Sequence, residues 1–99
     1  MYLTLYQWRL KPGKEQKFIE AWTRVTSHLQ NNTPQVSAKL LRTVQGQYLA
    51  LIEWPSQKDW ETQTTHNIDS LAQHELMSCV EELESLIPME CIKTLTPLS

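Results

Sequence analysis

The 99 residues include nine Lys and Arg against eleven Asp and Glu, which gives a formal net charge of -2. This balance argues against nucleic acid or an anionic membrane as a partner, since both require a basic face. The length predicts one domain, 1–99, with a core of its own. The longest apolar run, 48–52, is far too short to span a membrane.

The cysteine content and the first residues predict a cytoplasmic protein. Two cysteines, Cys79 and Cys91, fit a reduced compartment better than a disulfide scaffold. Met1 leads directly into a strand-like segment without a basic region followed by an apolar one, so we expect no signal peptide.

The first half of the chain alternates between strand and helix patterns. Residues 1–10 have the period of a strand and carry apolar side chains on both faces. After the turn at Pro12-Gly13, residues 14–30 have helical periodicity, with an apolar stripe on one side. The stripe consists of Phe18, Trp22, Val25 and Leu29. Residues 36–44 predict a second strand, and Gln45-Gly46 predicts a hairpin turn.

The second half begins with the most apolar strand and turns a corner. Residues 48–54 predict a central strand, which Pro55 ends because proline has no N–H to donate. Ser56 is a predicted N-cap for a short helix over 56–63. After a polar loop, residues 70–86 predict a longer helix, and Pro88 opens a last strand over 89–95. The apolar stripe expected on that helix consists of Ala72, Leu76, Cys79, Val80 and Leu83.

The predicted order is βαββαβ, an α+β chain of ferredoxin-like type. Two right-handed crossovers then give an antiparallel four-stranded sheet with the helices on one face. Because the first and central strands carry apolar groups on both faces, the open face is expected to meet a second sheet. An isologous homodimer supplies one most simply.

Three local features resemble the antibiotic biosynthesis monooxygenase family over roughly residues 2–95. They are the turn 11–15 before an amphipathic helix, the Gln45-Gly46 hairpin and the corner Glu53-Trp54-x-Ser56. The resemblance implies a dimeric α+β barrel made of two ferredoxin-like sheets. Some members of this family oxygenate aromatic polyketides without metal or flavin, and one branch degrades heme.

The residues of the heme-degrading branch are not found here. When the sequences are matched through the Trp54-x-Ser56 corner, its Trp falls on Gln63 and its His on Gln73. Its Asn falls on Tyr6 or Trp8. A His that many other members carry near the Gln63 position is also missing. The resemblance therefore implies neither heme degradation nor a particular general base.

Aromatic side chains predict either a packed core or a pocket wall. If the first and central strands are neighbours, four aromatic residues share one face of the sheet. These four are Tyr6, Trp8, Tyr48 and Trp54, and Trp60 follows at the corner. In the second interpretation they line a site for a flat aromatic ligand, and Gln63 and Gln73 add hydrogen bonds near the same cleft.

The three histidines show no spacing typical of a metal site, so we expect no metal, flavin or heme. His74 lies opposite the apolar stripe of its predicted helix, and His28 flanks the stripe of the first helix. His66 lies in the polar segment after Trp60, where a neutral imidazole at the mouth of a pocket acts as a base near pH 7. His66 is thus the candidate catalytic residue, and an inert loop histidine is the alternative.

Two classes of function fit these features. The first is a cofactor-independent monooxygenase for a small phenol-like or anthrone-like substrate. The second is a non-catalytic dimeric module that binds a small aromatic molecule, or a structural relative without a pocket. A ligand-sized cavity with a titratable group in its wall favours the enzyme, whereas a cleft filled by tryptophans favours the structural relative.

Overall fold

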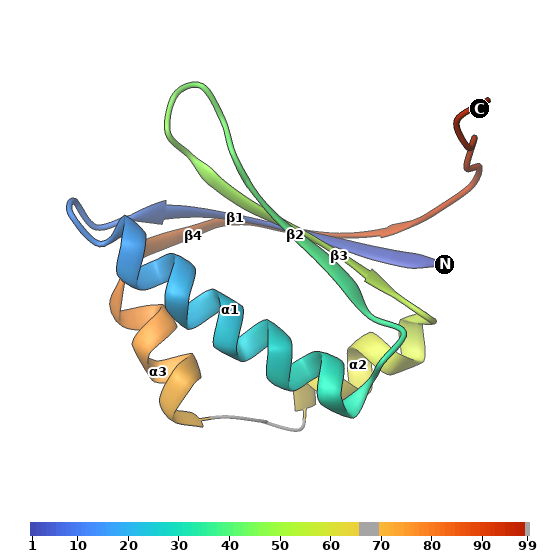
Figure 1. Ribbon diagram of the computed structural model, residues 1–99, viewed down its shortest axis with the longest axis horizontal. Coiled ribbons are helices and arrows are strands. Elements are labelled where there is room, and N and C mark those ends of the chain that lie inside the picture. Colours follow the sequence, from blue (N-terminus) through green and yellow to red (C-terminus); the bar gives the residue numbers. More distant parts are fainter. Residues whose placement is uncertain (66–69, 99) are drawn as a thin grey trace.

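The computed structural model describes residues 1–65 and 70–98. Its elements in chain order are β1 (Tyr2–Leu10), α1 (Glu15–Asn32), β2 (Ser37–Arg42), β3 (Tyr48–Trp54), α2 (Gln57–Thr65), α3 (Ser70–Ser78) and β4 (Val80–Glu90). The four strands form one antiparallel sheet in the order β2-β3-β1-β4. All three helices lie on the same face of this sheet (Figure 1). The predicted α+β, ferredoxin-like architecture is confirmed.

The register of the two central strands follows the alternation seen in the sequence. β1 pairs with β3 from Tyr2 opposite Trp54 to Trp8 opposite Tyr48. Side chains alternate along β3, so that every second residue is buried against the helices. Residues directly opposite each other in a sheet share a face. The expectation that the first and central strands are neighbours is therefore correct.

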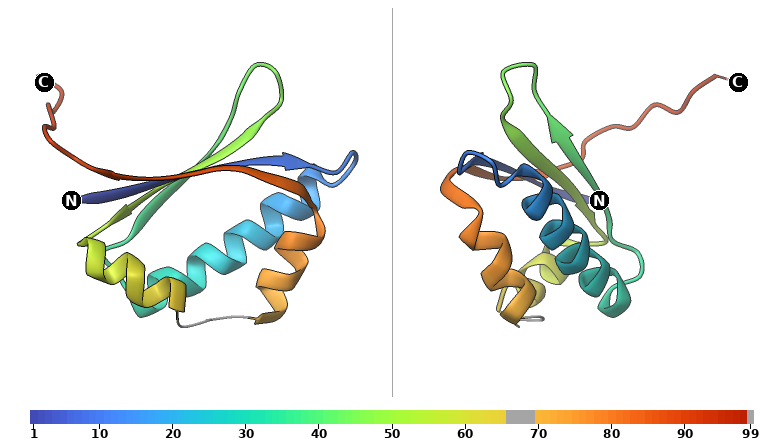
Figure 2. Two further views of the ribbon diagram at one scale, coloured as in Figure 1. Left: turned by 180° about the vertical axis from the view of Figure 1, so that it is seen from behind. Right: turned by 60° about the vertical axis from the view of Figure 1, so that its left-hand side comes forward.

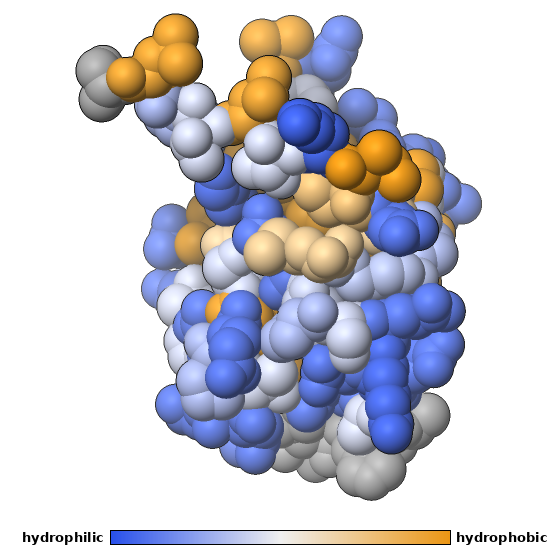
Figure 3. Space-filling model, turned by 90° about the vertical axis from the view of Figure 1, so that its right-hand side faces the viewer, coloured by the Kyte–Doolittle hydropathy of each residue, from blue (hydrophilic) through white to orange (hydrophobic). Residues whose placement is uncertain are grey.

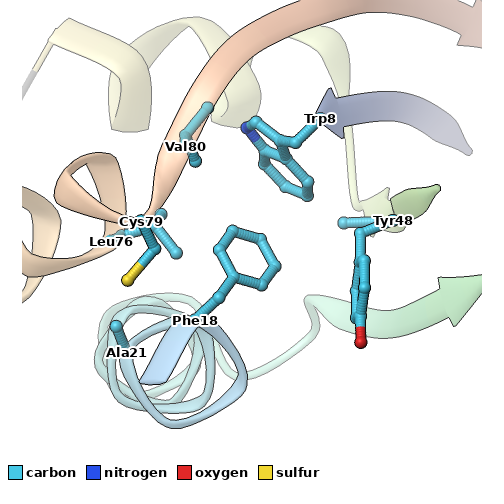
Figure 4. Close-up of a cluster of buried hydrophobic side chains, with 8 residues drawn as sticks. Trp8, Phe18, Ala21, Tyr48, Leu76, Cys79 and Val80 are labelled. Carbon is cyan, nitrogen blue, oxygen red and sulfur yellow. The ribbon is translucent and has the colours of Figure 1, made fainter. Parts of the chain in front are cut away.

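The main core lies between α1, α3 and the sheet (Figure 4). Phe18 of α1 is fully buried at its centre. Its ring meets Trp8 edge-on at 5.2 Å and Tyr48 edge-on at 5.8 Å between centroids. Such edge-to-face contacts stabilise a core beyond the area that they bury. Between the helices, Arg24 of α1 forms an ion pair with Glu75 of α3.

The corner after β3 is built as predicted. Ser56 Oγ accepts a hydrogen bond from the Asp59 N–H at 3.2 Å, which caps the start of α2. The Ser56 hydroxyl in turn donates to Asp59 Oδ2 at 2.6 Å. The cap fixes the direction in which α2 leaves the sheet.

The prediction of a helix over 70–86 is wrong. α3 ends at Ser78, and the chain turns directly into β4, which pairs with β1 from Val80 opposite Leu10 to Glu90 opposite Tyr2. The turn is closed by a hydrogen bond from the Cys79 N–H to the Leu76 carbonyl, and Cys79 O accepts one from Lys11 N–H. Tertiary pairing along the whole of β1 overrides the helical preference of the glutamate-rich stretch 81–84.

Two further details of this region differ from the prediction. Pro88 lies inside β4, opposite Thr4, and does not begin a strand. β4 is at the edge of the sheet, where a missing N–H is tolerated. The predicted last strand over 89–95 is also wrong, since β4 ends at Glu90. Residues 91–98 lead away from the body of the protein (Figure 1).

The sheet face opposite the helices is bare in the single chain (Figure 2). Its apolar side chains come from all four strands. They are Leu3, Leu5, Leu41, Leu49, Leu51, Ile87 and Met89. Viewed from the side, hydrophobic residues gather at the level of the sheet and the C-terminal segment, whereas the helical layer is mostly hydrophilic (Figure 3). In the part of the chain that the structure describes, no helix is both long and apolar enough to cross a membrane.

Candidate functional site

The four aromatic residues predicted to share a face all lie on the helical side of the sheet. Trp8, Tyr48 and Trp54 are buried there, and each belongs to one of the two core clusters. Trp54 Nε1–H donates to Thr4 Oγ1 at 3.0 Å, so the polar group of this buried indole is satisfied. The three side chains therefore pack in the core.

Tyr6 and Trp60 are only half buried and lie together at the edge of this core. Trp60 Nε1–H donates a long hydrogen bond, 3.5 Å, to Tyr6 Oη. The Trp60 ring also packs on Tyr2, with 5.6 Å between centroids and 31° between planes. The indole of Trp60, from α2, thus lies beside the phenol of Tyr6, from β1, and the indole N–H and the phenol hydroxyl are next to each other.

Beside this pair, part of β4 faces the helices without being covered by them. Leu83 pairs with Trp8 and Leu86 with Tyr6, which puts both leucines on the helical side of the sheet. They are nevertheless 44% and 43% exposed. Leu76 of α3 and Val80, at the start of the strand, belong to the main core cluster, whereas Leu83 and Leu86 are not among the residues packed in it. Tyr6, Trp60, Leu83 and Leu86 thus form an accessible aromatic and apolar surface, here called the β4 strip.

The predicted glutamines do not gather on the β4 strip. Gln63 Nε2–H donates to Thr33 Oγ1 at 3.0 Å, which ties the end of α2 to the residue that follows α1. Gln73 is exposed on α3, as is the neighbouring His74. His66, the predicted base, lies outside the described residues. Among the described residues, no three His, Cys, Asp or Glu side chains gather as a metal site requires.

Sequence reasoning missed the two leucines of the β4 strip. Both leucines fall in the predicted helix over 70–86, and only Leu83 belongs to its expected apolar stripe. The ladder between β1 and β4 shifts register between Gln7 and Trp8, where Glu84 is an extra residue on β4. This bulge breaks the alternation of period two by which a strand is found. Leu83 and Leu86 lie on the same face of the sheet only because residues 80–90 form a strand with a bulge between them.

No family model matches the sequence, and no curated protein matches it. Solved structures do match along most of the chain. A Caulobacter crescentus protein provisionally described as an antibiotic biosynthesis monooxygenase has 13% identity and a TM-score of 0.80, with 93% of this chain and 90% of that chain covered. SnoaB, described as a cofactor-independent oxygenase from Streptomyces nogalater, has 14% identity and a TM-score of 0.78, with 97% of each chain covered.

A third match has a different description. It is an uncharacterized NIPSNAP domain protein from Burkholderia xenovorans, with 10% identity, a TM-score of 0.72, and coverage of 98% of this chain and 100% of that chain. At such low identity these matches establish a shared fold. They confirm the resemblance noted in the sequence at that level: the chain has the fold of the antibiotic biosynthesis monooxygenases.

Proposed function

We propose that the protein is a cofactor-independent monooxygenase that binds a small electron-rich aromatic substrate, a phenol or anthrone, on the β4 strip. The observation that carries the proposal is the accessible apolar surface beside the Tyr6–Trp60 pair. A flat ring packs against Leu83, Leu86 and the indole, while the Tyr6 hydroxyl, which accepts from the indole N–H, donates its own hydrogen to an oxygen atom of the ring. The fold shared with SnoaB supports this choice of reaction.

The reaction needs little chemistry from the protein. A deprotonated anthrone gives an electron to O2, and the two radicals combine to a peroxide at the ring carbon. The peroxide then loses water. Overall the CH2 group becomes a carbonyl that keeps one oxygen atom, and the second oxygen leaves as water with the two hydrogens. The protein binds and orients the substrate and assists its deprotonation.

We propose His66 as the base that assists deprotonation. It follows α2, the helix that carries Trp60, directly in the chain, because α2 ends at Thr65. A neutral imidazole accepts a proton readily near pH 7.

We further propose that the protein works as a homodimer through the bare sheet face. Half-buried leucines on neighbouring strands, Leu5 and Leu51 among them, form an apolar patch on this face in the single chain. Pairing two copies of one apolar face about a twofold axis removes both from water. The β4 strip is on the opposite side of the sheet, so this pairing leaves it open to a substrate.

Oxygen uptake with anthrone tests the proposal. We expect the wild-type protein to consume O2 faster than anthrone alone, and Trp60→Ala to lose most of the increase because the ligand loses its aromatic partner. A protein that binds anthrone saturably and leaves its oxidation rate unchanged is a binding module. That result would contradict the proposed enzyme.

A further inference from the structure

A hollow lies on the helical side of the sheet, at the edge formed by β2. Its volume is about 350 Å³, and its lining comes from α1, β2 and the start of β3. The side chains that matter for its chemistry are Ile19, Trp22, Thr23, Leu40, Arg42 and Tyr48. The β4 strip lies at the opposite edge of the sheet, since β2 and β4 are its two outer strands. The hollow is thus separate from the site proposed above.

The lining of this hollow carries one cationic group. Arg42 is the only charged residue in its described lining, in a protein whose net charge is -2. Arg9 and Arg24 are both engaged by glutamates. Arg42, in contrast, forms no ion pair with any described residue. A guanidinium can bind an anion through two parallel hydrogen bonds.

The Tyr48 hydroxyl supplies a second polar group. The residue is only 4% exposed, and it pairs with Arg42 across the β2–β3 ladder. Among the described residues, the Tyr48 hydroxyl makes no hydrogen bond. Every fully buried side-chain oxygen of these residues has a hydrogen-bond partner, so the Tyr48 oxygen is not fully buried. The oxygen atom is thus at the surface that Tyr48 presents to the hollow. Figure 4 shows it directed away from Trp8 and out of the core cluster.

The remaining lining favours a flat apolar body. Trp22 contributes a half-buried indole, and Ile19 and Leu40 contribute aliphatic surface. Thr23 donates its hydroxyl hydrogen to the Ile19 carbonyl at 2.7 Å, so its oxygen remains an acceptor. A hollow of this volume, about 350 Å³, suits a ligand of one or two rings.

We propose that the hollow between α1 and β2 binds a small aromatic carboxylate. The carboxylate pairs with the Arg42 guanidinium and accepts from the Tyr48 hydroxyl, and the ring packs against Trp22. Arg42 and Tyr48 are on the helical side of the sheet, so the proposed pairing of the bare faces leaves the hollow accessible. The proposal does not depend on the monooxygenase reaction.

The test uses 2-naphthoate as the probe and 2-naphthamide as its neutral analogue. Binding is followed in an assigned 1H–15N NMR spectrum of the wild-type protein. We expect saturable shifts at Trp22, Arg42 and Tyr48 with naphthoate and much weaker shifts with the amide. Shifts confined to Tyr6 and Trp60 would place the probe on the β4 strip and overturn the proposal. Equal binding of the amide would overturn it as well.

Two substitutions in β2 distinguish a specific contact of the ligand with Arg42 from a general effect of the charge of the protein. Arg42→Gln removes the charge at the hollow, and we expect it to raise the Kd for naphthoate roughly tenfold or more, because a charge-assisted hydrogen bond is lost. Lys39→Gln removes the same charge from the other face of β2, since Lys39 pairs with Leu51. We expect this variant to bind as the wild type does. Equal weakening in both variants, or none in Arg42→Gln, would contradict the proposed site.

Discussion

Leu86 and Ile87 are neighbours in β4 and face opposite sides of the sheet. Leu86 pairs with Tyr6 on the helical side, and Ile87 pairs with Leu5 on the bare side. Their exposed fractions in the single chain are nearly equal, 43% and 46%. One residue lies in the β4 strip and the other in the proposed dimer face. Substitutions at Leu86 and at Ile87 therefore test ligand binding and dimerisation separately.

Leu86→Gln is expected to weaken the binding of an aromatic ligand such as anthrone about tenfold, because a half-exposed leucine loses its apolar contact with the ring. The sedimentation of the protein should not change. Ile87→Gln is expected to weaken dimerisation and leave the affinity per chain nearly unchanged. Fluorescence titration and analytical ultracentrifugation measure the two effects. If Leu86→Gln disturbs assembly and not binding, the assignment of the faces is wrong.

The dimer face can be tested with a charge at its centre. Leu51 lies on β3, in the middle of the bare face, and pairs with Leu5 of β1. Wild-type protein is expected to have twice the chain mass of 11.6 kDa in light scattering at micromolar concentration. Leu51→Lys should give monomer, since an unpaired ammonium group is costly to bury. Leu71→Lys, at a 67% exposed position on α3, is the control and should remain dimeric. A monomeric wild type would refute the paired sheets.

The buried hydrogen bond between Trp54 and Thr4 is expected to contribute to stability. Thr4 is fully buried, and its hydroxyl is the acceptor for the Trp54 indole N–H at 3.0 Å. Thr4→Val keeps the shape of the side chain and leaves this donor without a partner. We expect the free energy of unfolding to fall by about 1–3 kcal/mol. Urea denaturation at one fixed protein concentration measures the change, and Thr4→Ser, which keeps the hydroxyl, should recover most of it.

The proposed base is tested by comparing two histidines. If His66 removes the substrate proton, His66→Ala should lower the rate of anthrone oxygenation by roughly 10²–10⁴-fold. Ligand affinity should change far less. His74, exposed on α3, serves as the matched control, and His74→Ala should react at the wild-type rate. Unchanged turnover in His66→Ala would mean that the acidity of the substrate alone supplies the anion.

Much of the first two thirds of the fold could be predicted from local patterns. Alternation along 1–10 and 48–54 predicted β1 and β3, and the apolar stripe around Phe18 predicted α1. The N-cap at Ser56 also had a clear signal. In these segments local preference and tertiary contacts agree, and the sequence alone is then informative.

The last third could not be predicted in this way, because local preference and tertiary pairing disagree there. Glu81, Glu82 and Glu84 favour a helix, yet these residues belong to β4, where Arg9 of β1 forms ion pairs with all three. The prediction of the site was incomplete for the same reason. Tyr6 on the aromatic face of the sheet and Trp60 at the corner were predicted as parts of a pocket wall, but Leu83 and Leu86 belong to the β4 strip only through long-range pairing with β1.

We propose that this chain oxygenates an aromatic substrate without a cofactor. The most direct measurement follows the label of 18O2 into the carbonyl of the product. Purified protein is dialysed against a chelator, shown to have no flavin or heme absorption, and mixed with anthrone. We expect one labelled oxygen atom per anthraquinone, formed faster than in protein-free buffer and more slowly with Trp60→Ala. A labelled product that forms at the protein-free rate would contradict this proposal.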